Sequence, residues 1–280
     1  MVDIRHYVLI ATTVILLLGT LYSVTNSTYL DTSNPLLTHL PHKLASTHYF
    51  ASKANPLNVF FIKKAWGWTT LVFALSYLTS PPSARIPGRV AQYLALTAIW
   101  MLFTSWFFGP ALLDRIMVAS GGDCVYLMPG GELRSVPAEV CYARSAIAPE
   151  THPQLFAFLQ EDQGLTGVLP EGWRATPRLR RGHDLSGHVF LLTMSVLFLA
   201  DQLRASFRAR ERWSEVHKWA VAANVALMGI WLLGCYTTSV YFHTPIEKFT
   251  GYLLGVASFA VTQLPIFNVL PPAQEHPRRD

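Results

Sequence analysis

The chain of 280 residues contains six runs of predominantly apolar residues, each roughly the length a helix needs to cross a membrane. A helix rises about 1.5 Å per residue, so about 20 apolar residues span a hydrocarbon core of about 30 Å. Backbone groups in lipid must be hydrogen-bonded within their own segment, and the runs lack the alternation of barrel strands, so we expect helices. The runs are residues 7–22, 57–78, 90–113, 186–203, 219–242 and 249–267.

The composition excludes a soluble globular fold. Hydrophobic residues make up 51% of the chain and charged residues only 14%, against about one quarter charged in soluble domains. The first run follows Arg5 and resembles a secretory signal, but no small-x-small cleavage site follows it, which favours a retained span. We therefore predict an all-α polytopic membrane protein, with six transmembrane helices in a single integral membrane domain of residues 1–280.

The distribution of basic residues predicts the orientation. The short connections 80–89 and 204–218 are rich in arginine and lie on the same side as both termini when the number of spans is even. By the positive-inside rule that side is cytosolic, including a tail of residues 268–280. The long loop 114–184 then lies in the lumen. The net charge of +5 reflects this topology and does not indicate nucleic-acid binding.

Two of the three cysteines, Cys124 and Cys141, fall in the long loop. A lumenal compartment permits a disulfide between them, although two free thiols fit the sequence as well. Cys235 lies inside the fifth run, where a thiol packs as a small apolar group.

Two histidines stand at the lumenal ends of predicted spans, His188 at the start of the fourth run and His243 between the last two. One imidazole can attack phosphorus while the other protonates the leaving oxygen, so a convergent pair suits phosphoryl chemistry. Ser186 and Gly187 would add a hydroxyl and close backbone amides for an anion at a helix N-terminus.

Structural readings of the same residues stay open. A histidine at a membrane interface also serves as an interfacial or helix-capping residue, and Asp184 is as good a cap for the fourth helix as a catalytic group. The histidines of residues 39–48 have no cysteine or paired carboxylate near them. We therefore predict no metal site and no cofactor.

Three segments together resemble the fat storage-inducing transmembrane (FIT) family. They are HDLSGHVFLL at 183–192, VYFH at 240–243 and NPLNVFFIKKAWGWT at 55–69. The order of six spans with a long lumenal loop before the fourth extends the resemblance over nearly the whole chain.

The resemblance implies an endoplasmic reticulum enzyme with a lipid-phosphatase-like helical bundle, both termini cytosolic and the active site lumenal. It implies hydrolysis of fatty acyl-CoA to acyl 4'-phosphopantetheine and adenosine 3',5'-bisphosphate, which supports lipid droplet biogenesis and lipid homeostasis of that membrane. His243 would attack the phosphorus, His188 would protonate the leaving phosphate, and Glu247 would orient the nucleophile. The partners implied are the acyl-CoA substrate and membrane lipids.

The chain departs from the phosphatase superfamily at Tyr236 and Thr237, where the superfamily has Ser-Arg. Another cation must then bind the phosphate, and Lys63, Lys64 and Lys248 are the candidates, although interfacial snorkelling explains them as well.

Phe190, Leu191 and Leu192 directly follow His188 and would form an apolar wall for the acyl chain, or else pack within the helical bundle. The alternative function is a non-catalytic protein that binds neutral lipid or acts as a scaffold for droplet formation. Such a scaffold needs no paired imidazoles, so the histidines favour the enzyme.

Overall fold

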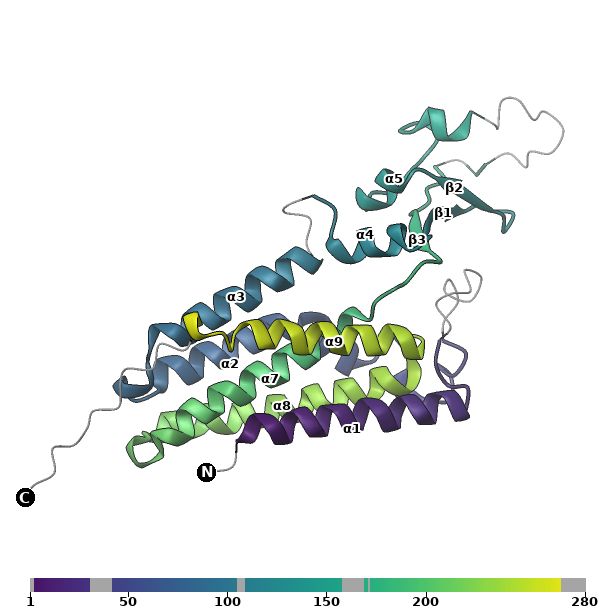
Figure 1. Ribbon diagram of the computed structural model, residues 1–280. Coiled ribbons are helices and arrows are strands. Elements are labelled where there is room, and N and C mark those ends of the chain that lie inside the picture. The colour runs from purple at the N-terminus through teal and green to yellow at the C-terminus, as the bar shows by residue number, and fades with distance from the viewer. Residues whose placement is uncertain (1–2, 31–41, 105–108, 158–168, 171, 268–280) are drawn as a thin grey trace, which may run out of the picture. The chain divides into compact units, whose positions relative to one another are not determined.

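The computed structural model describes residues 3–30, 42–104, 109–157, 169–170 and 172–267 (Figure 1). The predicted tail 268–280 lies outside the described residues. The chain divides into two compact units, one of residues 1–30, 41–100 and 186–280, and one of residues 31–40 and 101–185.

The first unit is helical. Its helices are α1 (Ile4–Thr25), α2 (Ala65–Thr79), most of α3 (Pro87–Thr104), α7 (Gly187–Arg208), α8 (Glu215–Tyr241) and α9 (Pro245–Val261). A π-helical turn (Leu57–Phe61) and a 3-10 turn (Ile62–Lys64) lead directly into α2. Among the described residues, α1, α7 and α8 are long and apolar enough to cross a membrane.

Helix α7 forms the centre of this unit. It packs against α1, α2, α8 and α9, and most of its side chains are buried. Aromatic rings attach α3 to α2, with Tyr93 stacked on Trp66 at 5.8 Å and on Phe73 at 4.9 Å between ring centroids. The core is thus built around the helix that carries His188.

Hydroxyl caps define where the helices begin. Ser186 caps α7, Ser214 caps α8, and Thr244 caps α9, with Pro245 in the first turn. Asp184, which we considered as the cap of the fourth helix, does not have this role because the helix starts after Ser186.

The second unit contains a small antiparallel sheet, so the all-α prediction is too narrow. Strand β1 (Asp123–Leu127) lies between β2 (Leu133–Val136) and β3 (Arg178–Arg180), with Val125 opposite Ser135 and Arg178. Short helices α4 (Leu112–Ala119) and α5 (Ala138–Tyr142) accompany it. The rest of the chain is mostly helical, as predicted.

A disulfide joins Cys124 to Cys141, with 5.8 Å between the Cα atoms, which confirms the first of the two readings of these cysteines. The bond connects β1 to α5. A small apolar cluster of Tyr126, Ile147 and Phe156 packs beside them. Cys235, in contrast, is a free thiol buried within α8, as predicted.

Candidate active site

His188 is the second residue of α7, and the start of this helix is attached to α9. The hydroxyl of Ser186 accepts from the backbone N–H of Val189 at 3.4 Å. The backbone N–H of Ser186 donates to the carbonyl of Glu247 at 3.1 Å. The residue that caps α7 is therefore bonded to the first turn of α9.

Two glycines four residues apart let α9 approach α7 closely. A Cβ on Gly251 would lie 2.6 Å from the carbonyl oxygen of Ser186, and one on Gly255 would lie 2.8 Å from that of Phe190. Small residues at this spacing are typical of close helix contacts in membranes. They bring the two helix starts, and the histidines beside them, into one region.

His243 stands in the turn between α8 and α9 in a strained backbone conformation. Its φ angle is +59°, in the left-handed region that residues other than glycine rarely adopt. Such strain persists only where the surrounding structure imposes it, and it is concentrated at functional sites.

Glu247 contacts both the ring of His243 and the start of α9. Its Oε2 atom lies 3.4 Å from Nδ1 of His243 and accepts the backbone N–H of Thr244 at 2.9 Å. The carboxyl is almost fully buried. Because Nδ1 faces this carboxylate, Nε2 is the ring nitrogen that points away from it.

His42 is hydrogen-bonded to the backbone two residues before His243. The carbonyl of Tyr241 accepts from Nε2–H of His42 at 2.9 Å and from the N–H of Leu30 at 3.0 Å. Nδ1 of His42 accepts the N–H of Leu44 at 3.0 Å. Burial lowers the pKa of His42, which is only 3% exposed. We predicted no role for this histidine, since a loop-to-backbone contact leaves no pattern in the sequence.

The two predicted catalytic histidines share one electrostatic environment. His188 interacts electrostatically with His243, and also with Lys63 and Lys53. His188 is half-buried, whereas Lys63 is exposed at the 3-10 turn before α2. The structure therefore brings together three of the predicted site residues and adds Lys53.

The ammonium group of Lys248 is buried and hydrogen-bonded within the bundle, so it is not placed to bind the phosphate. It donates to the hydroxyl of Ser23 at 2.9 Å and to the carbonyl of Ser239 at 2.6 Å, and the residue is 2% exposed. Of the three cations considered for the phosphate, Lys63 is the one that interacts with His188.

The three residues of the predicted acyl-chain wall differ in burial. Phe190 and Leu192 have no exposed surface, and Leu192 lies in the central apolar core. Leu191 is partly buried against the same core. An acyl chain could reach Phe190 or Leu192 only if the helices moved.

An apolar cavity of about 320 Å³ lies between α1 and α9, next to the turn that carries His243. A hydrogen bond of 2.7 Å between the hydroxyls of Thr13 and Tyr252 connects α1 to α9 at this cavity. Thr13, Leu16, Leu17 and Thr20 line it from α1, and Pro245, Lys248, Phe249 and Tyr252 from α9.

The described residues contain no group of three His, Cys, Asp or Glu side chains placed to hold a metal ion. The site itself contains two imidazoles, a buried carboxylate and nearby ammonium groups. This set suits proton transfer and nucleophilic attack on an anionic substrate.

Comparison with known proteins supports this chemistry. A family model described as fat storage-inducing transmembrane protein matches residues 46–223 and 206–263. The chain is 30% identical over 261 residues to acyl-coenzyme A diphosphatase fit1 of Schizosaccharomyces pombe, covering 92% of this chain and 83% of that protein. It is 27% identical over 222 residues to acyl-coenzyme A diphosphatase FITM2 of Homo sapiens, covering 75% and 70%. No solved structure matches.

Proposed function

This chain belongs to the fat storage-inducing transmembrane family, and from that membership we propose that it hydrolyses the diphosphate of fatty acyl-CoA. The products are acyl 4'-phosphopantetheine and adenosine 3',5'-bisphosphate, formed with the consumption of one water. The observation that carries the proposal is the hydrogen bond from the N–H of Ser186 to the carbonyl of Glu247. It holds the start of α7, where His188 lies, against the first turn of α9, and the Glu247 carboxylate lies beside the ring of His243.

In the proposed mechanism His243 is the nucleophile. The Glu247 carboxylate keeps the proton of His243 on Nδ1, facing Oε2, which leaves the lone pair of Nε2 to attack one phosphorus of the diphosphate. An N–P bond forms while the bond to the bridging oxygen breaks. His188 donates a proton to that oxygen, and water then hydrolyses the phosphohistidine, with His188 as the base.

Lys63 takes the place of the missing arginine in this proposal. It is exposed and interacts with His188, so its ammonium can meet the negative charge of the diphosphate. Lys53 adds a second positive charge nearby. Ser186 and Gly187 then act by fixing the start of α7, since Ser186 is buried and capping the helix.

The acyl chain is placed in the cavity between α1 and α9. The lining is mostly apolar, and Pro245 at its edge is two residues from His243. Leu191, which is partly buried, remains a second candidate contact for the acyl chain. Phe190 and Leu192 are fully buried and support α7 from within the protein.

The proposed setting is the endoplasmic reticulum membrane, with six spans arranged as a lipid-phosphatase-like bundle, cytosolic termini and a lumenal active site. The disulfide between Cys124 and Cys141 suits an oxidising lumen. We also propose a role in lipid droplet biogenesis and in the lipid homeostasis of that membrane, which membership of the family implies.

The test is hydrolysis of oleoyl-CoA by the purified, detergent-solubilised protein, with mass detection of both products. We expect His188→Ala and His243→Ala each to lose activity by a factor of at least about 100, while His6→Ala, an exposed histidine in the first turn of α1, retains it. Full activity in either site variant would refute the assigned roles. If all forms are inert while neutral lipid still binds, the scaffold function replaces the enzyme.

A further inference from the structure

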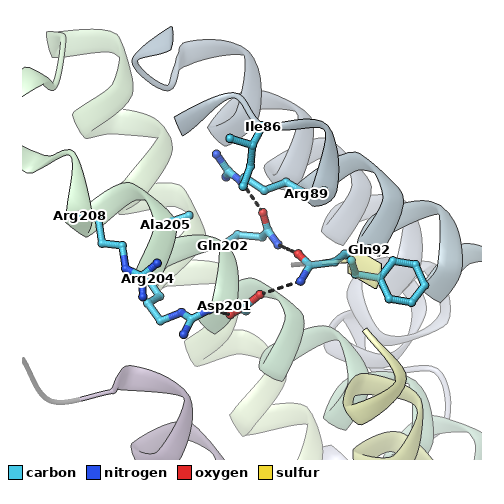
Figure 2. Close-up of a pocket in the computed structure, with 10 residues that line it drawn as sticks. Ile86, Arg89, Gln92, Asp201, Gln202, Arg204, Ala205 and Arg208 are labelled. Atoms are coloured by element: carbon cyan, nitrogen blue, oxygen red, sulfur yellow. Dashed lines mark hydrogen bonds and ion pairs between the residues drawn. The ribbon is translucent and has the colours of Figure 1, made fainter. Parts of the chain in front are cut away.

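A second cluster of charged and polar side chains lies near the C-terminal end of α7. From His188 to Arg208 the helix rises by about 30 Å, so this cluster is remote from the histidines. It consists of Arg89 and Gln92 from α3 and Asp201, Gln202, Arg204 and Arg208 from α7, and all six line one small cavity (Figure 2).

Most of this cluster is a connected hydrogen-bond network. Nε of Arg89 donates to Gln202 at 2.7 Å, Gln202 donates to Gln92 at 3.4 Å, and Gln92 donates to Asp201 at 3.3 Å. Asp201 in turn pairs with Arg204 at 3.1 Å. Figure 2 shows this chain of contacts running from α3 across to α7.

One N–H donor of Arg89 has no partner in this network. Arg89 is only 2% exposed, and its Nη2 atom is buried with no hydrogen-bond partner among the described residues. A charged N–H group buried without an acceptor is destabilising, because it has lost its hydrogen bond to water. The guanidinium also lies over the ring of Tyr77, with Cζ 5.4 Å from the ring centroid. Arg89 thus brings to the cavity a buried positive charge with one N–H that has no acceptor among the described residues.

The charge of the lining points to an anion as that acceptor. The lining contains three arginines and one aspartate, and that aspartate is already paired with Arg204. Arg208 is exposed at the edge, and the described residues provide no ion pair for it. Arginine binds phosphate oxygens through two parallel hydrogen bonds, which suits it to this role.

The size and position agree with a phosphate group. A cavity of about 40 Å³ holds about three water-sized atoms, comparable to the oxygens of one phosphate. Basic pockets between helices at a membrane surface are a known form of lipid head-group site.

We propose that this cavity is a second anion site that binds a phosphate monoester through Arg89, Arg204 and Arg208, at the end of the bundle opposite the histidines. The phosphate can belong to a lipid head group or to a soluble ion. The site is independent of acyl-CoA hydrolysis, so its failure would leave the proposed function untouched.

Native mass spectrometry of the delipidated protein in detergent tests the proposal, with phosphatidic acid, phosphatidylcholine and inorganic phosphate as separate probes. We expect phosphatidic acid to bind in preference to phosphatidylcholine. Arg208→Gln should weaken that binding about tenfold, and Arg89→Gln at least as much. Arg212→Gln, which removes an exposed arginine outside the cavity, should leave it unchanged.

Inorganic phosphate distinguishes the two sources. Displacement of phosphatidic acid by phosphate, with the same dependence on Arg208, assigns the site to the phosphate group alone, and failure to displace it assigns the site to the lipid. Equal binding of both lipids would overturn the proposal, as would equal weakening by Arg212→Gln and Arg208→Gln. Arg208 is exposed, so its replacement tests the site even if Arg89→Gln does not fold.

Discussion

Glu247 has two partners in the structure, the ring of His243 and the backbone N–H of Thr244, and these can be separated by substitution. Glu247→Gln keeps an acceptor for the capping box, since glutamine also serves in that motif. It removes the negative charge that supports the protonated Nδ1. We expect kcat to fall at least about tenfold, with a changed pH profile and unchanged melting temperature.

The matched control is Glu215→Gln, an exposed glutamate in the first turn of α8. If both variants lose activity equally, or if Glu247→Gln simply lowers the melting temperature, Glu247 is structural and does not orient His243.

Lys63 and Lys64 are neighbours, and both are exposed. Of these two lysines, Lys63 is the one that interacts electrostatically with His188. Lys63→Gln should lower kcat/KM for oleoyl-CoA about tenfold, the effect of losing one charge-assisted hydrogen bond to phosphate. Lys64→Gln should have a much smaller effect. Steady-state kinetics of the two variants decide, and equal losses would mean that general surface charge matters and not this lysine.

At the level of residues, the sequence predicted His188 and His243 because their chemistry and the order of the spans point to the same end of the bundle, and the family resemblance implied the role of Glu247. It did not predict His42, Lys53 or the orphan donor of Arg89. Each of these depends on a contact between residues far apart in the chain, which residue type alone does not reveal.

Two glycines of α9 determine how closely it packs on α7, and Gly251 is the one nearest the site. A Cβ there would meet the backbone oxygen of Ser186 at 2.6 Å, and backbone cannot rotate away. Gly251→Ala should destabilise the protein by about 1–3 kcal/mol and displace the start of α7, with loss of hydrolysis. Thermal unfolding and the oleoyl-CoA assay measure the two effects.

Gly229→Ala is the control, since a Cβ at that position in α8 meets nothing within 4 Å. Alanine should be neutral or stabilise that helix by about 0.5–1 kcal/mol. A stable, active Gly251→Ala protein would show that α7 and α9 can separate without cost to the site.

The loop around His42 predicts a pH dependence of stability. Burial lowers the pKa of His42, so the unfolded chain binds this proton more readily than the folded protein. Stability is therefore lost as pH falls below about 6.5, down to the lowered folded value. Protonation of Nδ1 would also break its hydrogen bond from Leu44.

We expect the melting temperature to fall more for the wild type than for His42→Gln between about pH 7.5 and about pH 5.5. Other titrating groups, including nearby Lys43 and Lys53, contribute alike to both proteins and cancel in the comparison. Equal falls would exclude His42 as the source.

At the level of elements, apolar runs predicted the main helices because a membrane span has a length and composition that local sequence displays. The sheet of the second unit was missed. Its strands are only three to five residues long, and β3 pairs with β1 from far along the chain, since Asp123 is opposite Arg180, 57 positions later. Pairing at that separation leaves no local pattern.

The orientation of the whole molecule is a prediction from the charges in its short connections. The connection between α7 and α8 carries Arg210 and Arg212, and the positive-inside rule predicts that it lies in the cytosol. On that prediction the hairpin between β1 and β2 lies in the lumen, where N-glycosylation takes place. Gly130, in that hairpin, has open space around it.

The test uses an Asn26→Gln background, because Asn26-Ser27-Thr28 is itself an N-glycosylation acceptor. A new acceptor at the hairpin, made by Gly130→Asn with Glu132→Thr, should be glycosylated in cells, and endoglycosidase treatment should then shift the protein's mobility on a gel. An acceptor between α7 and α8, made by Arg212→Asn before Trp213-Ser214, should remain unmodified. The reverse result would place the histidines in the cytosol. It would also move the anion cavity of Arg89 to the lumenal surface, so one gel assigns both ends of the bundle to their compartments.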